Sequence, residues 1–228
     1  MSGVPFNDWV IEYKPQENDV IFKYLPFQPV VEKDYHDGQN FLTVDPFVAL
    51  ATDDIPNKVD IMFGYTDAEA IIMIPLYARS YIKRYNRFRE MFDPSKVLFK
   101  VDPDTDLAIA QKIIDHYFGN KSISVSNMKD MVTYGSFASV ATDVQRYFRL
   151  MPEFPDRTRF MYKFSCVSGL NFFGHFGAKY NITGAAHMDD LLYLFYAPAL
   201  HLDVAKGTLD YKLIQQETTI FTNFIKYG

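Results

Sequence analysis

The chain has 228 residues, of which 48% are apolar and 22% charged, with a formal net charge of −5 at pH 7. This balance is typical of a globular protein rather than a disordered one, and the length suffices for one substantial α/β domain. The acidic net charge, without any run of basic residues, argues against a nucleic-acid partner, because binding along phosphates needs clustered lysine and arginine.

Other features of the composition bear on the cellular compartment. No apolar stretch is long enough to span a membrane, and the first residues lack the charged-then-apolar pattern of a signal peptide. Cys166 is the single cysteine, so no internal disulfide can form and cysteine usage does not decide the redox compartment. Asn120 and Asn181 each begin a sequon, are candidate N-glycosylation sites, and favour secretion.

The first half of the chain predicts loops, then a strand and two helices. Residues 1–58 are dotted with prolines and lack periodicity, which indicates extended loops. The run 58–64 predicts a buried strand, followed by an apolar helix over about 68–78 and an amphipathic helical pattern over 79–92. Glu69 lies just past the strand, where sites assemble in open α/β sheets.

Two capped helices come next. Asp104 or Thr105 can cap a helix that runs to Gly119. Ser126 or Asn127 can cap a longer one, which Pro152 and Pro155 end. The buried stripe expected on this second helix comprises Met131, Tyr134, Phe137, Ala138, Ala141, Val144 and Phe148.

The second half of the chain predicts a strand, a long loop and a terminal helix. Residues 158–167 alternate between aromatic and polar side chains, which is the best strand pattern in the chain. A glycine-containing loop leads from there to His187. An amphipathic helix is expected from Thr208 or Asp210 to Lys226. Neither a repeat nor a low-complexity linker marks a domain boundary.

The segment around His187 joins a loop to a helix in an unusual way. Small residues at 184–186 allow a tight turn and leave one face of the imidazole open. Asp189 and Asp190 lie where the first helical turn would begin, at the positive end of the helix dipole. The buried side of this helix is expected to comprise Leu191, Leu192, Leu194 and Phe195. A loop histidine without chemistry is the plain alternative to a general base.

Two strand ends therefore carry the two candidate catalytic groups. Glu69 follows the strand at 58–63, and His187 lies in the loop after the strand at 158–167. An acid followed later by a histidine is the second half of the chain order nucleophile, acid, histidine of serine hydrolases.

Several stretches resemble the type-B carboxylesterase and cholinesterase family. Residues 64–69 (GYTDAE) resemble its glycine-x-Asn-x-x-Glu-Gly stretch, and 184–195 (GAAHMDDLLYLF) are very like the histidine motif of its insect carboxylesterase branch. Residues 164–171 and 221–228 also resemble family segments, in the family's order over nearly all of 25–228. Two departures stand out: Thr66 replaces an asparagine, and Ala70 replaces a glycine, which puts the turn geometry around Glu69 in question because alanine tolerates fewer backbone angles.

The resemblance implies an α/β fold, a partial α/β-hydrolase with the C-terminal half of its central sheet and flanking helices. Residues 1–228 would then form a single incomplete domain. The sequence has no Gly-x-Ser-x-Gly; its nearest stretch, 166–170 (CVSGL), lacks both flanking glycines, and no glycine-rich oxyanion loop occurs. In the family both lie upstream of the acid. We therefore expect a C-terminal portion of a longer esterase, whose partner is the missing N-terminal part of the same domain.

The mechanism that the resemblance implies is that of a serine ester hydrolase without cofactor or metal. An upstream serine would attack the carbonyl of a small-molecule ester, His187 would move its proton, and Glu69 would orient the imidazole. Asp190 matches an acidic family position that supports the loop, and Asp189 is expected to be solvated. The chain alone should not hydrolyse esters, and the sequence does not indicate which ester is the substrate.

Alternatives remain open. A catalytically inactive cholinesterase-like binding or adhesion protein would share the same fold, and only the upstream serine distinguishes it. A metal protein using His175, His187 or His201 is a third interpretation, although their spacings match no zinc pattern. We expect secretion or a secretory-pathway location, with a signal peptide in the missing part; a cytoplasmic location is the alternative.

Overall fold

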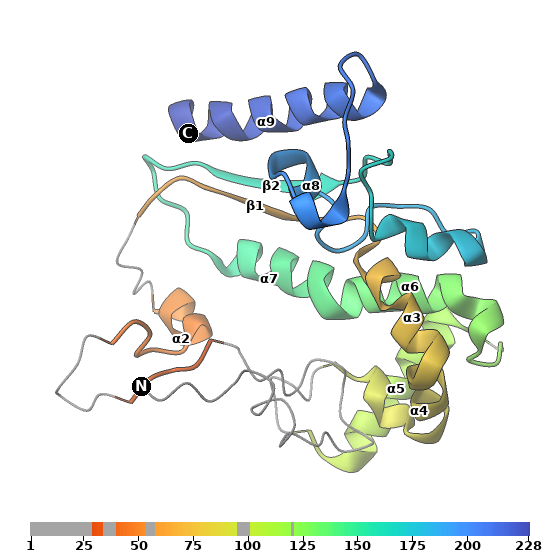
Figure 1. Ribbon diagram of the computed structural model, residues 1–228. Helices are drawn as coiled ribbons and strands as arrows, with labels where there is room; N and C mark the ends of the chain where they lie inside the picture. The colour runs from red at the N-terminus through yellow and green to blue at the C-terminus, as the bar shows by residue number, and fades with distance from the viewer. Residues whose placement is uncertain (1–28, 34–39, 53–57, 95–100, 120) are drawn as a thin grey trace, which may run out of the picture. The chain divides into compact units, whose positions relative to one another are not determined.

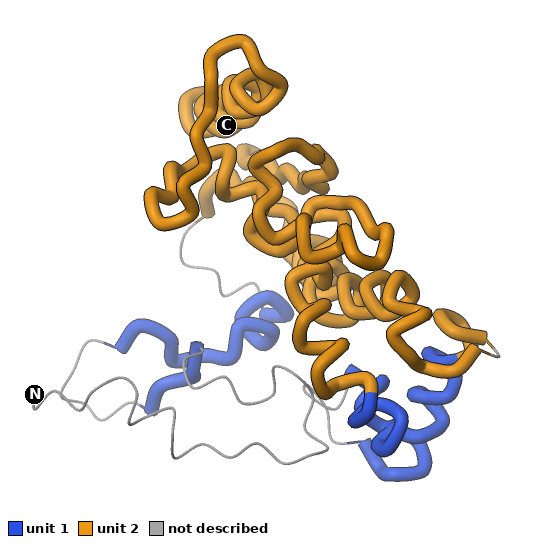
Figure 2. Tube along the Cα trace, turned by 45° about the vertical axis from the view of Figure 1, so that its right-hand side comes forward, with its two compact units in different colours: residues 1–55, 83–114 blue, residues 56–82, 115–228 orange. Residues whose placement is uncertain are grey.

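The computed structural model describes residues 29–33, 40–52, 58–94, 101–119 and 121–228 (Figure 1). The chain forms two compact units, coloured in Figure 2, of which one comprises 1–55 with 83–114 and the other 56–82 with 115–228. The prediction of a single domain over 1–228 stays a prediction.

The described residues form two strands and a series of helices. In order they are α2 (Pro46–Ala51), β1 (Ile61–Thr66), the 3₁₀ helix η1 (Glu69–Met73), α3 (Ile74–Leu76), the π-helix η2 (Tyr77–Tyr81), α4 (Ile82–Arg87), the 3₁₀ helix η3 (Arg89–Phe92), α5 (Pro103–Tyr117), the 3₁₀ helix η5 (Val125–Asn127), α6 (Met128–Ser136), the π-helix η6 (Phe137–Ala141), α7 (Thr142–Leu150), β2 (Arg159–Phe164), the 3₁₀ helix η7 (Gly174–Tyr180), α8 (Leu191–Leu194), the 3₁₀ helix η8 (Pro198–Leu200) and α9 (Leu209–Tyr227).

The strands β1 and β2 are parallel neighbours, paired from Ile61 opposite Arg159 to Thr66 opposite Phe164. Parallel neighbours need a long crossover, which the helices between the strands provide. β1 begins and ends later than the predicted 58–64, because its extent is set by pairing with β2 rather than by its own composition. The loops that carry Glu69 and His187 consequently leave the sheet at the same edge.

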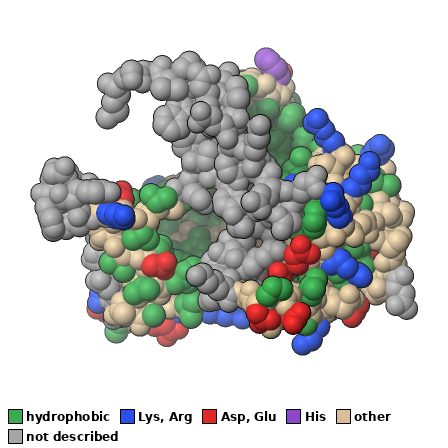
Figure 3. Space-filling model, turned by 90° about the horizontal axis from the view of Figure 1, so that it is seen from below, with side chains coloured by type: hydrophobic (Ala, Val, Ile, Leu, Met, Phe, Trp, Pro, Cys, Tyr) green, Lys and Arg blue, Asp and Glu red, His purple; other side chains and the backbone are tan. Residues whose placement is uncertain are grey.

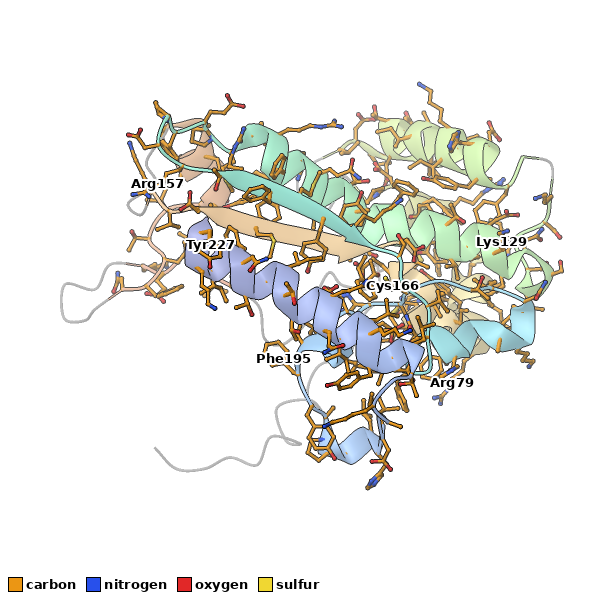
Figure 4. All side chains as sticks on the ribbon, turned by 90° about the horizontal axis from the view of Figure 1, so that it is seen from above. Arg79, Lys129, Arg157, Cys166, Phe195 and Tyr227 are labelled. Carbon is orange, nitrogen blue, oxygen red and sulfur yellow. The ribbon has the colours of Figure 1, made fainter. Side chains whose placement is uncertain are left out.

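One helix covers each face of this pair. On one face, Phe160 and Tyr162 of β2 contact rings of α9, with centroids 6.0 Å from Phe224 and 5.6 Å from Phe221. On the other face, Phe63 of β1 contacts the rings of Tyr147 and Phe148 on α7. Figure 1 shows α9 and α7 on opposite sides of the strands, and Figure 4 labels Tyr227 at the end of α9. Successive side chains along a strand point to opposite faces of the sheet. The strand pair therefore contributes side chains to both helix layers.

The long helix predicted to begin near Ser126 is present but interrupted. α6 and α7 are joined by the π-helix Phe137–Ala141, so the stretch from Met128 to Leu150 is helical throughout. Of the expected buried stripe, Met131, Tyr134 and Ala141 are buried, whereas Phe137 is exposed. The π-helix accounts for this, because its wider turn shifts the helix faces relative to a regular 3.6-residue repeat.

Caps at the other helices were predicted with mixed success. Thr208 caps α9 by accepting a hydrogen bond from the Tyr211 amide, and the helix begins at Leu209, which confirms the start predicted at Thr208 rather than at Asp210. At α5 the cap prediction was wrong, because Asp102 accepts the Thr105 amide at 3.0 Å and the helix begins at Pro103. A proline in the first turn needs no amide partner, so the cap lies before it.

The helix after His187 is a single turn, and its predicted buried side was wrong. Tyr193 is buried, while Leu191 and Phe195 are exposed. Tyr193 packs its ring on Phe164 at 5.1 Å and shares a buried cluster with Leu170 and Ala185. A single turn is anchored by one large side chain, and here that side chain is the tyrosine.

The surface of the described residues mixes chemical types. On the face seen in Figure 3, acidic, basic and hydrophobic side chains are interspersed. Within the described ranges, no helix combines the length and the apolar character that crossing a membrane requires.

Candidate active site

Glu69 and His187, 118 positions apart in the sequence, are in direct contact. Glu69 is the first residue of η1, just past the end of β1, and its Oε2 lies 2.7 Å from the Nδ1 atom of His187. The other carboxylate oxygen, Oε1, accepts a hydrogen bond of 2.7 Å from the Thr66 amide. The Glu69 side chain is 4% exposed and that of His187 is 51% exposed. A fixed, buried acid thus holds an imidazole whose remaining surface is open.

The electrostatics of the pair suit proton transfer. The hydrogen bond with Glu69 is the main cause that raises the pKa of His187 above 6.5, aided by the charges of Glu69 and Asp190 and opposed by burial. A carboxylate accepts the Nδ1–H, so the neutral ring presents Nε2 as a base. Within the described part of the chain, no serine hydroxyl is hydrogen-bonded to the imidazole.

Asp189 was predicted to be solvated, and this was wrong, because its exposed fraction is 0%. Its Oδ2 accepts the amides of Ala186 at 2.8 Å and Gly174 at 3.0 Å, and its Oδ1 accepts the Phe173 amide at 3.0 Å. The side-chain amide nitrogen of Asn171 donates a fourth hydrogen bond to Oδ2 at 3.4 Å. Burial raises the pKa of Asp189, and these donors work against the rise.

Asp190 joins the start of α8 to the sheet. Its Oδ1 accepts the Leu191 amide at 3.0 Å, and its Oδ2 accepts the Tyr162 hydroxyl of β2 at 3.1 Å. Burial, followed by the charge of Asp190, raises the pKa of Tyr162. The carboxylate does not contact the His187 ring through a hydrogen bond, so its contacts are those of a support.

A model of the carboxylesterase family matches residues 1–228. The chain belongs to the carboxylesterase family. It is also similar in structure to juvenile hormone esterase from Manduca sexta, crystallised with OTFP covalently attached, with a TM-score of 0.67 and 23% sequence identity. That match covers 88% of this chain and 38% of the esterase. A comparison with curated proteins gives no match.

The comparisons confirm the resemblance to type-B carboxylesterases and the partial α/β-hydrolase fold. The chain spans 38% of the length of the insect esterase that it matches. The parallel pair β1–β2, covered by one helix on each face, is the part of such a sheet that the described residues contain.

Two departures of this chain from the family pattern are accommodated. Ala70, in place of glycine, is buried with no positive φ, and its amide donates to the hydroxyl of Ser136 at 3.0 Å. Thr66, in place of asparagine, still donates its backbone amide to Glu69. The turn geometry therefore does not require glycine at position 70.

Sequence reasoning overlooked four polar residues that lie next to the histidine loop. Asp67 accepts the Ala185 amide at 2.8 Å. The side chain of Asn171 donates to the carbonyl of Cys166 and accepts hydrogen bonds from the Ser168 amide and the Tyr193 hydroxyl. The Tyr193 hydroxyl also lies 2.6 Å from the Ser168 hydroxyl. Only Asp67, at a strand end, carried a usable sequence signal.

The other residues that the sequence suggested for a site lie apart from the pair. Among the described residues, no group of three or more histidine, cysteine or acidic side chains could hold a metal ion, His175 and His201 included. Asn181 is exposed at the end of η7 with φ 54°, and Asn120 lies outside the described residues. Cys166 is partly buried, and burial raises the pKa of its thiol.

Proposed function

We propose that this chain supplies the acid and the histidine of a Ser-Glu-His triad that hydrolyses small-molecule carboxylic esters. The supporting observation is the 2.7 Å contact between Glu69 and His187 at the edge where two parallel strands end. Membership of the carboxylesterase family supports the reaction class.

The roles follow from the geometry. A serine from sequence outside these 228 residues attacks the ester carbonyl, and His187 Nε2 takes its proton and returns it to the leaving alcohol. Glu69 accepts the Nδ1–H, keeps Nε2 unprotonated before the attack, and stabilises the imidazolium during it. The half-exposed His187 ring is reachable by such a serine, whereas the buried Glu69 is not.

The decisive experiment begins with the transcript upstream of codon 1. We expect an in-frame Gly-x-Ser-x-Gly, and we expect the longer product to hydrolyse p-nitrophenyl acetate. His187→Ala should lower the rate constant by about a millionfold, and Glu69→Gln by about ten-thousandfold, as in other serine hydrolases. His201→Ala, a histidine outside the pair, is the matched control and should retain full activity.

Contrary outcomes are equally concrete. An upstream sequence without the motif would replace the proposal with an inactive binding or adhesion protein of the same fold. Turnover by residues 1–228 alone that disappears in His187→Ala would show that the nucleophile lies within this chain.

We also propose that the protein enters the secretory pathway and carries an N-linked glycan on Asn181. The support is the exposed position of Asn181 within the sequon Asn181–Ile182–Thr183. Expressed with a signal peptide in insect cells, the protein should lose mass on treatment with peptide N-glycosidase. Asn181→Gln should remove that part of the shift, and an unchanged mass in wild type and variant would refute the assignment.

A further inference from the structure

Three consecutive amides of the histidine loop are each held by an oxygen from a different residue. The Ala185 amide donates to Asp67 Oδ1 at 2.8 Å, and the Ala186 amide donates to Asp189 Oδ2 at 2.8 Å. The His187 amide donates to the backbone oxygen of Glu69 at 3.1 Å. We call this set of three hydrogen bonds the amide clamp.

The clamp joins the loop to two other parts of the fold. Asp67 follows the end of β1, and the neighbouring Ala68 amide donates back to the Ala185 carbonyl at 3.0 Å. Asp189 also accepts amides from the start of η7, at Phe173 and Gly174. The backbone before His187 is therefore tied to the segment from the end of β1 to Glu69 on one side and to the start of η7 on the other.

Packing of the ring itself cannot fix the position of His187, because its side chain is 51% exposed. A rotatable, half-exposed ring keeps a hydrogen bond to a fixed carboxylate only if its backbone is held as well. The clamp provides that restraint at the histidine and at the two residues before it.

The chemistry of Asp189 points the same way. Its carboxylate is fully buried, and among the described residues no cation forms an ion pair with it. A buried charge costs free energy unless hydrogen bonds satisfy it. What the carboxylate provides is two oxygens that collect four donors around the loop.

The geometry points to Asp67 and Asp189 as positioning residues of the proposed esterase: by accepting the amides of Ala185 and Ala186, they hold His187 against Glu69. This inference rests on the proposed function. It assigns no contact with substrate to either aspartate.

The test is the NMR titration of the His187 ring in the 228-residue chain, assigned with His187→Gln. In the wild type the pKa should lie above 6.5, because of the Glu69 hydrogen bond. Asp67→Ala should bring it back toward that value, because the loop is released. Asp67→Asn, which removes the same charge, separates lost pairing from lost charge.

Two variants control for charge and for general damage. Asp67→Asn keeps a carbonyl oxygen that can accept the Ala185 amide, and the His187 pKa should stay at the wild-type value. Asp60→Ala removes an aspartate that accepts the Thr158 amide at 2.7 Å beside the opposite end of β1, and it should also leave the titration unchanged.

Each outcome decides something. An unchanged His187 pKa in Asp67→Ala would overturn the clamp but leave the proposed function intact. An equal fall in Asp67→Asn and Asp67→Ala would also overturn it. A wild-type ring that titrates as free imidazole would overturn the pairing and with it the proposed function. Should Asp67→Ala not fold, slow hydrogen exchange of the Ala185 and Ala186 amides in the wild type supports the clamp, and fast exchange overturns it.

Discussion

Replacing Asp189 with alanine should cost a large part of the stability of the fold. The change leaves the backbone amides of Ala186, Gly174 and Phe173 without their acceptor. A buried donor without a partner costs about 1–3 kcal/mol, and because Phe173 and Gly174 are only partly buried, the three donors together cost about 3 kcal/mol. Releasing a buried carboxylate, whose pKa burial raises, offsets part of this. The expected net loss is about 2–3 kcal/mol, against a total of about 5–15 kcal/mol for a typical domain.

The assay is urea unfolding of the wild type and variants at neutral pH. Asp189→Asn retains one carbonyl oxygen, so its free energy of unfolding should fall by less than that of Asp189→Ala, by about 1–2 kcal/mol. Asp156→Ala removes an exposed aspartate and should change the free energy of unfolding by less than about 0.5 kcal/mol. A loss below about 1 kcal/mol in Asp189→Ala, at an unchanged m-value, would refute the count of buried donors.

Three further changes test the same region. Folding raises the pKa of His187, so the protonated ring stabilises the folded state fully below about pH 6.5, and this stabilisation is lost as the pH rises through the folded pKa. In Glu69→Gln, the urea midpoint should therefore change less with pH over this range than in the wild type. Gly184→Ala places a Cβ 2.6 Å from that of Ala68 at a φ of 155°, and should lower the free energy of unfolding by about 1–3 kcal/mol, as measured by thermal unfolding. A variant as stable as the wild type would show that the loop shifts to make room for the methyl group. Tyr193→Phe removes a hydrogen bond of 2.7 Å to a buried amide oxygen and should cost about 1 kcal/mol, whereas a stabilised variant would contradict it.

The contact between Glu69 and His187 could be anticipated because it follows from two local patterns. A β-rich run before the acid and an alternating run before the histidine predict two strands, and parallel strands release their following loops at one edge. The structure places the two side chains 2.7 Å apart at that edge. The boundaries of β1 were less accurate, since a strand's limits depend on its partner.

The roles of Asp67 and Asp189 could not be anticipated in the same way. Each accepts backbone amides, and an amide is present at every position except proline, so no residue pattern identifies the donor. Asp67 and its donor Ala185 are 118 positions apart. A pair of adjacent acids before an apolar run predicts a helix start, and Asp190 confirms this by capping α8. The side chain of Asp189 points into the protein because of a turn that depends on the rest of the fold.

The alanine at position 70 shows why a motif should be judged by its surroundings. Ala70 is buried, and its methyl group faces α6. Gly135 of α6 faces it, and a Cβ on Gly135 would lie 2.9 Å from that of Ala70 and 2.2 Å from the Tyr77 hydroxyl. Gly135 therefore leaves room for the methyl group of Ala70 and for the Tyr77 hydroxyl, and Glu69 keeps its bonds to Thr66 and His187. An alanine after the acid is thus compatible with the bonds that hold the histidine.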